Sequence, residues 1–291
     1  MTFSAPHDVV RDCVARALGE DLDAVGDLTA ALLDQEALGE LVIRSREVGV
    51  IAGQACVVET FTQLDTSVVV DVVSDDGSRV EPGQVITRIS GRLCVILTGE
   101  RTALNFLGHL SGVASATAAM VEIVRAVAPE TKVLDTRKTT PGLRVLEKAA
   151  VRAGGGTNHR MNLSDALLIK DNHLGFLSIA EAVERAQTLW PGKAIEVEVE
   201  DLAQLTEAAH AGATSVLLDN MSPDQAKEAM VLARSLNPGL LVEVSGGITL
   251  ENAAAYAAAG VDLISSGALT HSIKNLDLGL DVLGPESAKG R

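Results

Sequence analysis

The stretch AIEVEVEDLAQLTEAAHAGATSVLLDN, residues 194–220, carries the pattern on which the fold of this chain depends. Its two ends, 194–199 and 215–220, are short apolar runs typical of buried strands. The segment between them, 201–212, has the apolar spacing of an amphipathic helix. The same alternation runs through the second half of the chain, with further strands predicted at 132–136, 166–170, 240–247 and 262–268 and further helices at 178–189, 222–236 and 249–260.

Strand–helix units in series predict parallel strands joined by right-handed crossovers. A closed (β/α) barrel and an open doubly wound sheet both satisfy this pattern. We favour the barrel, because nearly every predicted strand ends in a polar residue or glycine, and the carboxyl ends of barrel strands converge on one mouth. No GxGxxG motif follows a predicted strand, which argues further against an open dinucleotide-binding sheet.

The first hundred or so residues have a different character. Apolar residues at helical spacing predict helices at 8–22 and 53–64, and strand-like runs occupy 39–53, 67–91 and 92–97. Residues 98–128 then predict one or two helices with small residues on a packed face. The sequence thus indicates a mixed α/β domain followed by the barrel.

Composition excludes several classes of function. A net charge of −15 and an aromatic content of 2% argue against nucleic-acid binding, which needs a basic footprint and stacking rings. No apolar run reaches the ~18 residues of a membrane span. The N-terminus lacks a charged region followed by an apolar one, so we expect no secretory signal. Three widely spaced cysteines predict reduced thiols in a cytoplasmic protein.

A cationic stretch, LDTRKTTPGLRVLEKAAVRAGGGTNHR at 134–160, stands out in this acidic chain. Arg137 and Lys138 follow a predicted strand, so we expect them to point into the barrel mouth. Arg144, Lys148 and Arg152 recur at i, i+4 and i+8 of a helix, and we interpret them as a solvated or interface stripe. The glycine-rich loop that follows either ends the helix or brings His159 and Arg160 to a ligand.

Other predicted strand ends supply further charges. Lys170 closes an apolar strand, where a lysine is costly unless it meets an anion. Glu196, Glu198 and Glu200 alternate with valines, so they line the barrel interior if the valines face the helices; Asp219 ends the next strand. These carboxylates either serve a ligand or are counterions for Arg137 and Lys170.

The last two predicted strands end in SGG (245–247) and SSGAL (265–269), where barrels frequently bind phosphate through backbone N–H groups. The mouth therefore combines cations, carboxylates and a phosphate cradle. The residue types fit a phosphorylated sugar together with a compact polyanion, with Mg²⁺ bridging phosphate oxygens.

The motifs resemble, in order and over essentially the whole chain, those of the quinolinate phosphoribosyltransferase family. The matching segments are TGERTALNFLGHLSG, DTRKTTPGLRVLEKAAVRAGGGTNHR, ALLIKDNH, EVEVE, LLDN, SGGI and SGALTHS. The resemblance implies an N-terminal open α/β sandwich and a C-terminal (β/α) barrel with about seven parallel strands. It implies an N-terminal domain at 1–108, joined by the tail 272–291, and a catalytic barrel at 109–271. It also implies transfer of phosphoribose from phosphoribosyl pyrophosphate to quinolinate, with decarboxylation to nicotinate mononucleotide in de novo NAD synthesis.

The resemblance further implies residue roles. The implied quinolinate ligands are Arg101, Thr136, Arg137, His159, Arg160 and Lys170. The implied phosphoribosyl pyrophosphate ligands are Lys138, Glu198, Asp219, Asn220, Ser245, Gly246, Gly247, Ser266, Gly267, Ala268 and His271. The implied catalytic residues are Lys138, Lys170, Glu198 and Asp219, of which Glu198 and Asp219 would contact Mg²⁺ directly or through water. A homodimer, or a higher oligomer built from it, would supply Arg101 to the neighbouring subunit's site.

Three alternatives stay open at this point. A relative acting on another pyridine acid, or the molybdenum-operon paralogue, would share the barrel, although the presence of both Arg137 and Arg160 favours a diacid. A binding or scaffold protein would not need Glu198 and Asp219 opposite Lys170. A nucleotide-binding regulatory protein would bind the product without turnover.

Overall fold

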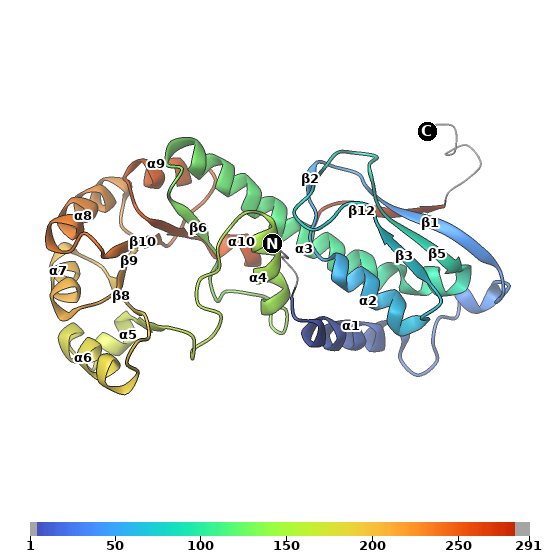
Figure 1. The fold of residues 1–291 in the computed structure, drawn as a ribbon, viewed down its shortest axis with the longest axis horizontal. Coiled ribbons are helices and arrows are strands. Elements are labelled where there is room, and N and C mark those ends of the chain that lie inside the picture. The colour runs from blue at the N-terminus through green and yellow to red at the C-terminus, as the bar shows by residue number, and fades with distance from the viewer. Residues whose placement is uncertain (1–4, 283–291) are drawn as a thin grey trace. The chain divides into compact units, whose positions relative to one another are not determined.

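The structure of the chain, a computed structural model, describes residues 5–282. It divides into two compact units (Figure 1). Unit 1 holds the described residues of Met1–Ala118, Thr140–Gly155 and Ile273–Arg291, and unit 2 holds Ala119–Thr139 and Gly156–Ser272. Helix α4 (Arg144–Ala153) thus groups with the N-terminal residues, whereas the division expected from the sequence assigned it to the barrel domain.

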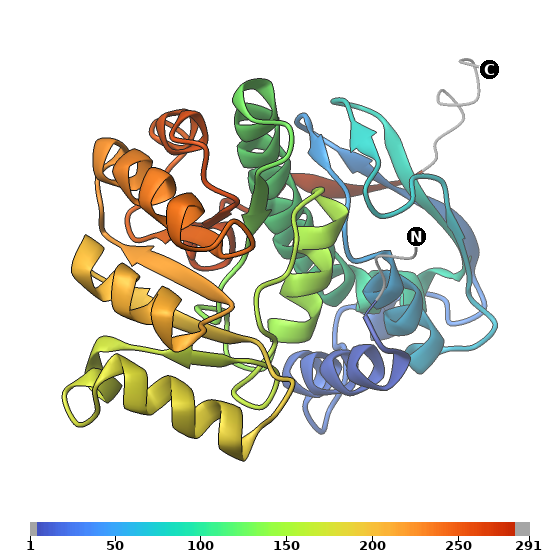
Figure 2. The ribbon, with the colours of Figure 1, turned by 60° about the vertical axis from the view of Figure 1, so that its left-hand side comes forward.

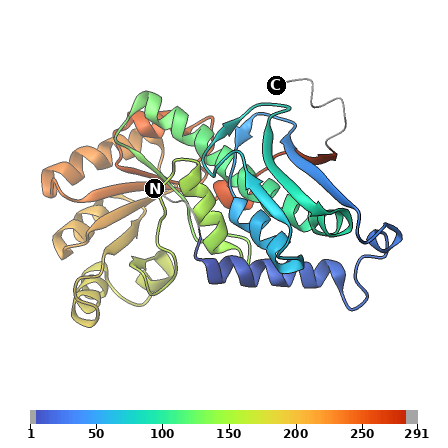
Figure 3. The ribbon, with the colours of Figure 1, turned by 45° about the vertical axis from the view of Figure 1, so that its right-hand side comes forward.

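Unit 1 is built on a four-stranded antiparallel sheet in the order β12-β1-β5-β3. Helices α2 and α3 lie against one face of this sheet (Figure 3). Phe61 of α2 and Leu107 of α3 pack with Ile43 and Ile89 of the sheet in one buried cluster, which holds the helices there. The bounds are β1 (Leu38–Ser45), α2 (Gln54–Leu64), β3 (Val69–Val72), β5 (Val85–Arg92), α3 (Leu93–Val127) and β12 (Leu278–Val282), with α1 (His7–Leu22), η1 (Ala30–Leu32), β2 (Gly49–Val50) and β4 (Arg79–Val80) around them.

Helix α3 corrects one prediction. The run 92–97 is not a strand: only Arg92 belongs to β5, and α3 begins at Leu93. Its buried residues Ile96, Ala103 and Leu107 recur at helical spacing, so tertiary packing stabilises a helix over a run that reads locally as a strand. By length and composition α3 could also span a membrane, but half of its most apolar window is buried inside the fold, as in a core helix.

Unit 2 contains a parallel sheet of six strands in the order β6-β11-β10-β9-β8-β7. Thr157 adds a one-residue parallel bridge to Leu134 of β6. All six predicted strands are present, as β6 (Lys132–Leu134), β7 (Leu167–Ile169), β8 (Ile195–Val199), β9 (Ser215–Asp219), β10 (Leu241–Ser245) and β11 (Leu263–Ser265). The barrel-like α/β architecture predicted from the sequence is confirmed.

Helices cover the outer face of this sheet (Figure 2). They are α6 (Ile179–Leu189), α7 (Leu202–Ala211), α8 (Pro223–Leu236) and α9 (Ala253–Ala258). The short α5 (Asp171–Leu174) and α10 (Ala268–His271) follow the carboxyl ends of β7 and β11. The side chains of Ser178, Asp201 and Ser222 cap α6, α7 and α8 by accepting backbone N–H bonds. Val197, Val216 and Val242 face these helices, so residues between them on each strand point to the opposite, inner face.

Candidate active site

The predicted charged residues of unit 2 do gather at the carboxyl edge of the parallel sheet. Ser245 pairs with Asp219 and Ser265 with Leu134, so the ends of β10, β9, β11 and β6 lie level with one another. The residues that follow these strands therefore emerge at one edge. Thr136, Arg137 and Lys138 follow β6, Lys170 follows β7, and Ser266, Gly267 and Ala268 follow β11.

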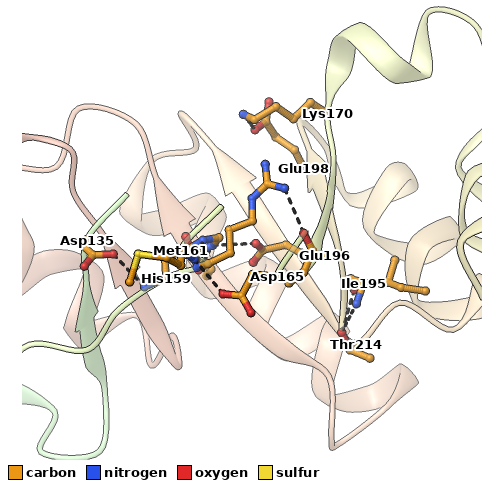
Figure 4. Close-up of polar contacts among 12 residues, drawn as sticks. Asp135, His159, Met161, Asp165, Lys170, Ile195, Glu196, Glu198 and Thr214 are labelled. Atoms are coloured by element: carbon orange, nitrogen blue, oxygen red, sulfur yellow. Dashed lines mark hydrogen bonds and ion pairs between the residues drawn. The ribbon is translucent and has the colours of Figure 1, made fainter. Parts of the chain in front are cut away.

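Lys170 and Glu198 form an ion pair at this edge. The Nζ atom of Lys170 lies 2.5 Å from Oε2 of Glu198 (Figure 4). The Glu198 side chain is 10% exposed and that of Lys170 is 42% exposed, so the lysine covers the carboxylate and still reaches solvent. Glu198 is therefore a counterion for Lys170 in this structure, one of the two readings left open by the sequence.

A buried carboxylate fixes the loop that carries His159. Asp135, which follows β6, is fully buried. Its Oδ1 accepts the backbone N–H of His159 at 2.9 Å, and its Oδ2 accepts the side-chain amide of Asn158 at 2.5 Å. Asp135 was not among the predicted site residues, although it follows an apolar strand directly, the same signal that singled out Arg137.

The imidazole of His159 meets two buried glutamates on the inner face. Its Nε2 lies 2.9 Å from Oε2 of Glu196 and 3.4 Å from Oε2 of Glu243 (Figure 4 labels the first pair). Glu243, in the middle of β10, is 1% exposed, so its carboxylate meets the His159 ring away from water. Glu243 was not among the predicted site residues either, although it alternates with valines in LLVEVSGG as Glu196 does in IEVEV.

This cluster holds more protons than its members would in water. Burial by itself lowers the pKa of His159, but hydrogen bonds and charges of Glu196 and Glu243 raise it to about 10. Burial raises the pKa of Glu243, and the nearby Glu196 charge acts in the same direction. The backbone N–H of Arg160 donates to Nδ1 of His159 at 2.8 Å, a bond that the neutral ring accepts and that protonation of Nδ1 breaks.

The predicted phosphate loops have the backbone geometry that glycine permits. Gly246 and Gly247 have φ values of +90° and +62°, and a side chain on Gly246 would collide with the Asn220 amide. A Cβ on Gly267 would lie 2.9 Å from Cδ of Lys138 and 3.0 Å from Nε2 of His271. These glycines let the side chains of Asn220, Lys138 and His271 approach the backbone of the two loops. The Ser266 hydroxyl is buried and donates to the Ile248 carbonyl.

The basic stripe on α4 excludes the solvated alternative of the two predicted from the sequence and leaves the interface alternative. Lys148 is fully buried, as is the neighbouring Glu147, and Arg144 and Arg152 are only partly exposed, so the stripe is not solvated. Helix α4 packs Leu146 and Val151 into a buried cluster of unit 1, which leaves little of its surface to water. Arg101 is exposed and lies on the part of α3 that belongs to unit 1.

Two groups of side chains in unit 2 are candidate ligands for a divalent cation, and one of them fits. Asp219, at the end of β9, accepts the Asn220 side-chain amide at 2.8 Å and lies on the strand next to that of Glu198. Both supply the oxygen ligands that Mg²⁺ prefers. His159, Glu196 and Glu243 also have ligand atoms within 4.8 Å of one another. A metal-bound histidine normally donates its other ring N–H, whereas Nδ1 of His159 accepts one, so this second group does not fit a metal.

Comparisons with known proteins identify the family. The model of the quinolinate phosphoribosyl transferase C-terminal domain matches residues 113–281, and that of the N-terminal domain matches residues 27–111. The chain belongs to the quinolinate phosphoribosyl transferase family. The carboxylating nicotinate-nucleotide pyrophosphorylase of Mycobacterium leprae is 42% identical over 289 residues, which cover 97% of this chain and 100% of that protein.

Two other proteins of this kind resemble the chain in sequence or in structure. A probable carboxylating nicotinate-nucleotide pyrophosphorylase of Bacillus subtilis is 44% identical over 266 residues, 90% of each chain. The solved structure of the nicotinate-nucleotide pyrophosphorylase from Francisella tularensis superposes with a TM-score of 0.91 at 41% identity, covering 97% of this chain and 99% of that one. The fold of that structure is thus shared over 97% of this chain.

Proposed function

We propose that this chain transfers the phosphoribosyl group of phosphoribosyl pyrophosphate to the ring nitrogen of quinolinate. The products are nicotinate mononucleotide, CO₂ and pyrophosphate, a step of de novo NAD synthesis. The observation that carries the proposal is the gathering of cations and carboxylates at one edge of the parallel sheet, in a chain whose family models cover both domains. We expect the enzyme to act in the cytoplasm.

Quinolinate is a dianion, and the cations beside β6 and β7 match it. We assign its carboxylates to Thr136, Arg137, His159, Arg160 and Lys170, because planar guanidinium groups bind carboxylates in a bidentate manner. Burial and the nearby Arg137 charge lower the pKa of Arg160, which means that the two guanidinium groups repel each other in the absence of an anion. A dicarboxylate relieves that repulsion.

We assign phosphoribosyl pyrophosphate to Lys138 and to residues at the carboxyl ends of β8, β9, β10 and β11. Lys138 and His271 come close to Gly267, so a phosphate bound at the β11 loop would meet both side chains. Asn220, Ser245, Gly246, Gly247, Ser266 and Ala268 form the rest of this assignment. Glu198 and Asp219 would bind the ribose hydroxyls. Mg²⁺ held by these carboxylates, directly or through water, would neutralise charge on the pyrophosphate oxygens.

The proposed reaction needs no nucleophile from the protein. The protein positions the two substrates and stabilises the charges that develop during the reaction. As pyrophosphate leaves, positive charge grows on the ribosyl carbon, and Glu198 and Asp219 stabilise it while Lys138 and Lys170 stabilise the departing anion. The pyridine nitrogen then attacks the ribosyl carbon. The resulting pyridinium accepts the electron pair left by the 2-carboxylate as CO₂ departs, and the carbon takes up one proton.

The quaternary structure forms part of the proposal. We propose a homodimer in which each subunit supplies Arg101 to the site of the other, and in which higher oligomers, if formed, are built from this dimer. The exposure of Arg101 supports this, because the residue is available at the surface of unit 1. In a two-fold dimer the same contact occurs twice.

The decisive experiment mixes the protein with quinolinate, phosphoribosyl pyrophosphate and Mg²⁺ and follows the loss of quinolinate together with the appearance of nicotinate mononucleotide. Nicotinate replaces quinolinate as the control substrate, and Lys227→Met, an exposed change on α8, is the control variant for Lys170→Met. We expect turnover of quinolinate only, abolished in Lys170→Met and retained in Lys227→Met. Equal use of nicotinate would exclude the diacid assignment.

A further inference from the structure

A cavity of about 540 Å³ lies in unit 2, away from the phosphate loops. Its walls come from edge strand β7, from α6 and from the loop that joins Arg160 to β7. Figure 2 shows α6 beside the edge of the sheet formed by β7. A volume of this size falls within the range of about 300–1,000 Å³ found for small-molecule sites.

The interior of the cavity is apolar because α6 presents small residues to it. Ala182 and Ala186 leave space against Leu167 of β7. Leu189 and Trp190, at the end of α6, line the same space although 62% and 53% of their surfaces are exposed. Large apolar side chains that are this exposed and border one concave site indicate a surface that binds an apolar group.

The charges around the cavity have one sign. Arg160, Arg185 and Lys193 line it, and among the described residues no aspartate or glutamate does, in a chain of net charge −15. Lys193 donates to the carbonyls of Ser164 and Asp165 at 3.0 and 2.9 Å. Its charge is therefore bound to neutral backbone oxygens rather than to a carboxylate.

Two acidic side chains close in sequence to the cavity residues, Asp165 and Glu181, accept other hydrogen bonds. The Asp165 carboxylate accepts the backbone N–H of Met161 at 2.8 Å. The Glu181 carboxylate accepts hydrogen bonds from the backbone N–H and the hydroxyl of Ser178. These bonds lower the pKa of Glu181, and the Arg185 charge makes a smaller contribution in the same direction. The cations at the cavity thus remain available to an anion.

We propose that this cavity binds a small amphipathic organic anion, an aryl or medium-chain alkyl carboxylate. Its apolar body would lie against Leu167, Ala186 and Trp190, and its carboxylate would meet Arg185 and Lys193. Arg160 is shared with the proposed quinolinate site, and its Nη1 donates at 3.1 Å to the carbonyl of Ala166, which also lines the cavity. A bound anion therefore competes with quinolinate for Arg160, a link that rests on the proposed function.

Trp190 makes binding measurable without any activity assay. It is the single tryptophan of the chain and it lines the cavity, so the intrinsic tryptophan fluorescence reports this site alone. The experiment titrates octanoate, and separately 1-octanol, into the whole protein. We expect a saturable fluorescence change with octanoate and an apparent Kd at least tenfold weaker with octanol. No saturable change with octanoate would overturn the proposed site, and equal binding of octanol would overturn the choice of an anion.

Three variants locate the site. The double variant Arg185→Gln/Lys193→Gln should weaken octanoate binding at least fivefold, and Ala186→Leu should abolish it by filling the cavity. Lys227→Gln, a change of the same charge on exposed α8, should leave it unchanged. Far-UV circular dichroism confirms that each variant is folded. Unaltered binding in the folded double variant would refute the assignment of the carboxylate.

Steady-state kinetics test the link to catalysis. Octanoate should raise the KM for quinolinate in the wild-type protein, and the increase should largely vanish in the double variant, whose KM without octanoate should be normal. An equal increase in both proteins would mean that octanoate binds in the active site itself. An unchanged KM together with saturable fluorescence would overturn the competition for Arg160. Lack of any quinolinate turnover would refute the proposed function but leave the binding result intact.

Discussion

Replacement of Glu243 by glutamine tests the buried cluster around His159. The variant keeps the size of the side chain and removes one of the two carboxylates that face the ring. The pKa of His159 is raised from 6.5 to about 10. At about 1.4 kcal/mol per pH unit this corresponds to roughly 5 kcal/mol in favour of the protonated cluster. Burial by itself lowers this pKa, so the two carboxylates together raise it by more than the net change, and loss of one of two equal contributions in Glu243→Gln should lower the pKa by at least about 2 pH units.

Nuclear magnetic resonance of ¹³C-labelled histidine measures this pKa directly. The chain has six histidines, and the His159 signal is the one that disappears in His159→Gln. We expect the wild-type signal to titrate near pH 10 and the Glu243→Gln signal at or below about pH 8. Glu228→Gln, which removes an exposed glutamate from α8, is the control and should leave the titration unchanged.

The free energy of unfolding should depend on pH through the pKa of His159. A group whose pKa is raised on folding stabilises the native state fully below its unfolded value and loses that contribution as pH rises through its folded value. The His159 contribution is therefore present below about pH 6.5 and lost towards about pH 10. Urea unfolding from pH 6 to 10 should show this loss at lower pH in Glu243→Gln. A His159 signal that titrates near pH 6.5 in both proteins would refute the reasoning.

Four further predictions follow from the site and the fold. Arg137→Ala should raise the quinolinate KM by losing a charged hydrogen bond worth about 1.5–3 kcal/mol, and unchanged quinolinate affinity in calorimetry would remove this residue from the site. EDTA should abolish turnover but leave quinolinate binding measurable, so full activity in metal-free buffer would contradict the Mg²⁺ assignment. Arg101→Ala and Lys170→Ala should each be nearly inactive, yet recover about a quarter of wild-type activity after subunit exchange, because half the random dimers carry one intact site. No recovery despite demonstrated exchange would place Arg101 in its own chain. Glu147→Ala should lower the free energy of unfolding by roughly 3 kcal/mol, as it leaves the bonds to His109 and to the Thr140 amide unmade; a change below about 1 kcal/mol by urea denaturation would show that water replaces the carboxylate.

The spacing of apolar residues along the sequence determined the strands and helices of unit 2. It also determined where many of the charged residues of the candidate site lie. The six strands were predictable because each is a short apolar run between amphipathic helices. Parallel strands put their carboxyl ends at one edge, so a charged residue that closes a run, such as Lys170 or Asp219, can be placed there from the sequence. The alternation of Glu196 and Glu198 with valines likewise predicted which side chains face inwards.

Tertiary structure decided what local pattern left ambiguous. The run 93–97 has the composition of a strand but lies in α3, because the buried face of that helix continues through Ile96. Lys148 has the spacing of a solvated stripe but is fully buried, because α4 packs within unit 1. Glu243, His159 and Asp135 are far apart in the chain, and only the pairing of β6, β11 and β10 in one sheet joins them through buried hydrogen bonds and charges. A residue's burial and partners depend on such long-range contacts, which the spacing of residues within one segment does not encode.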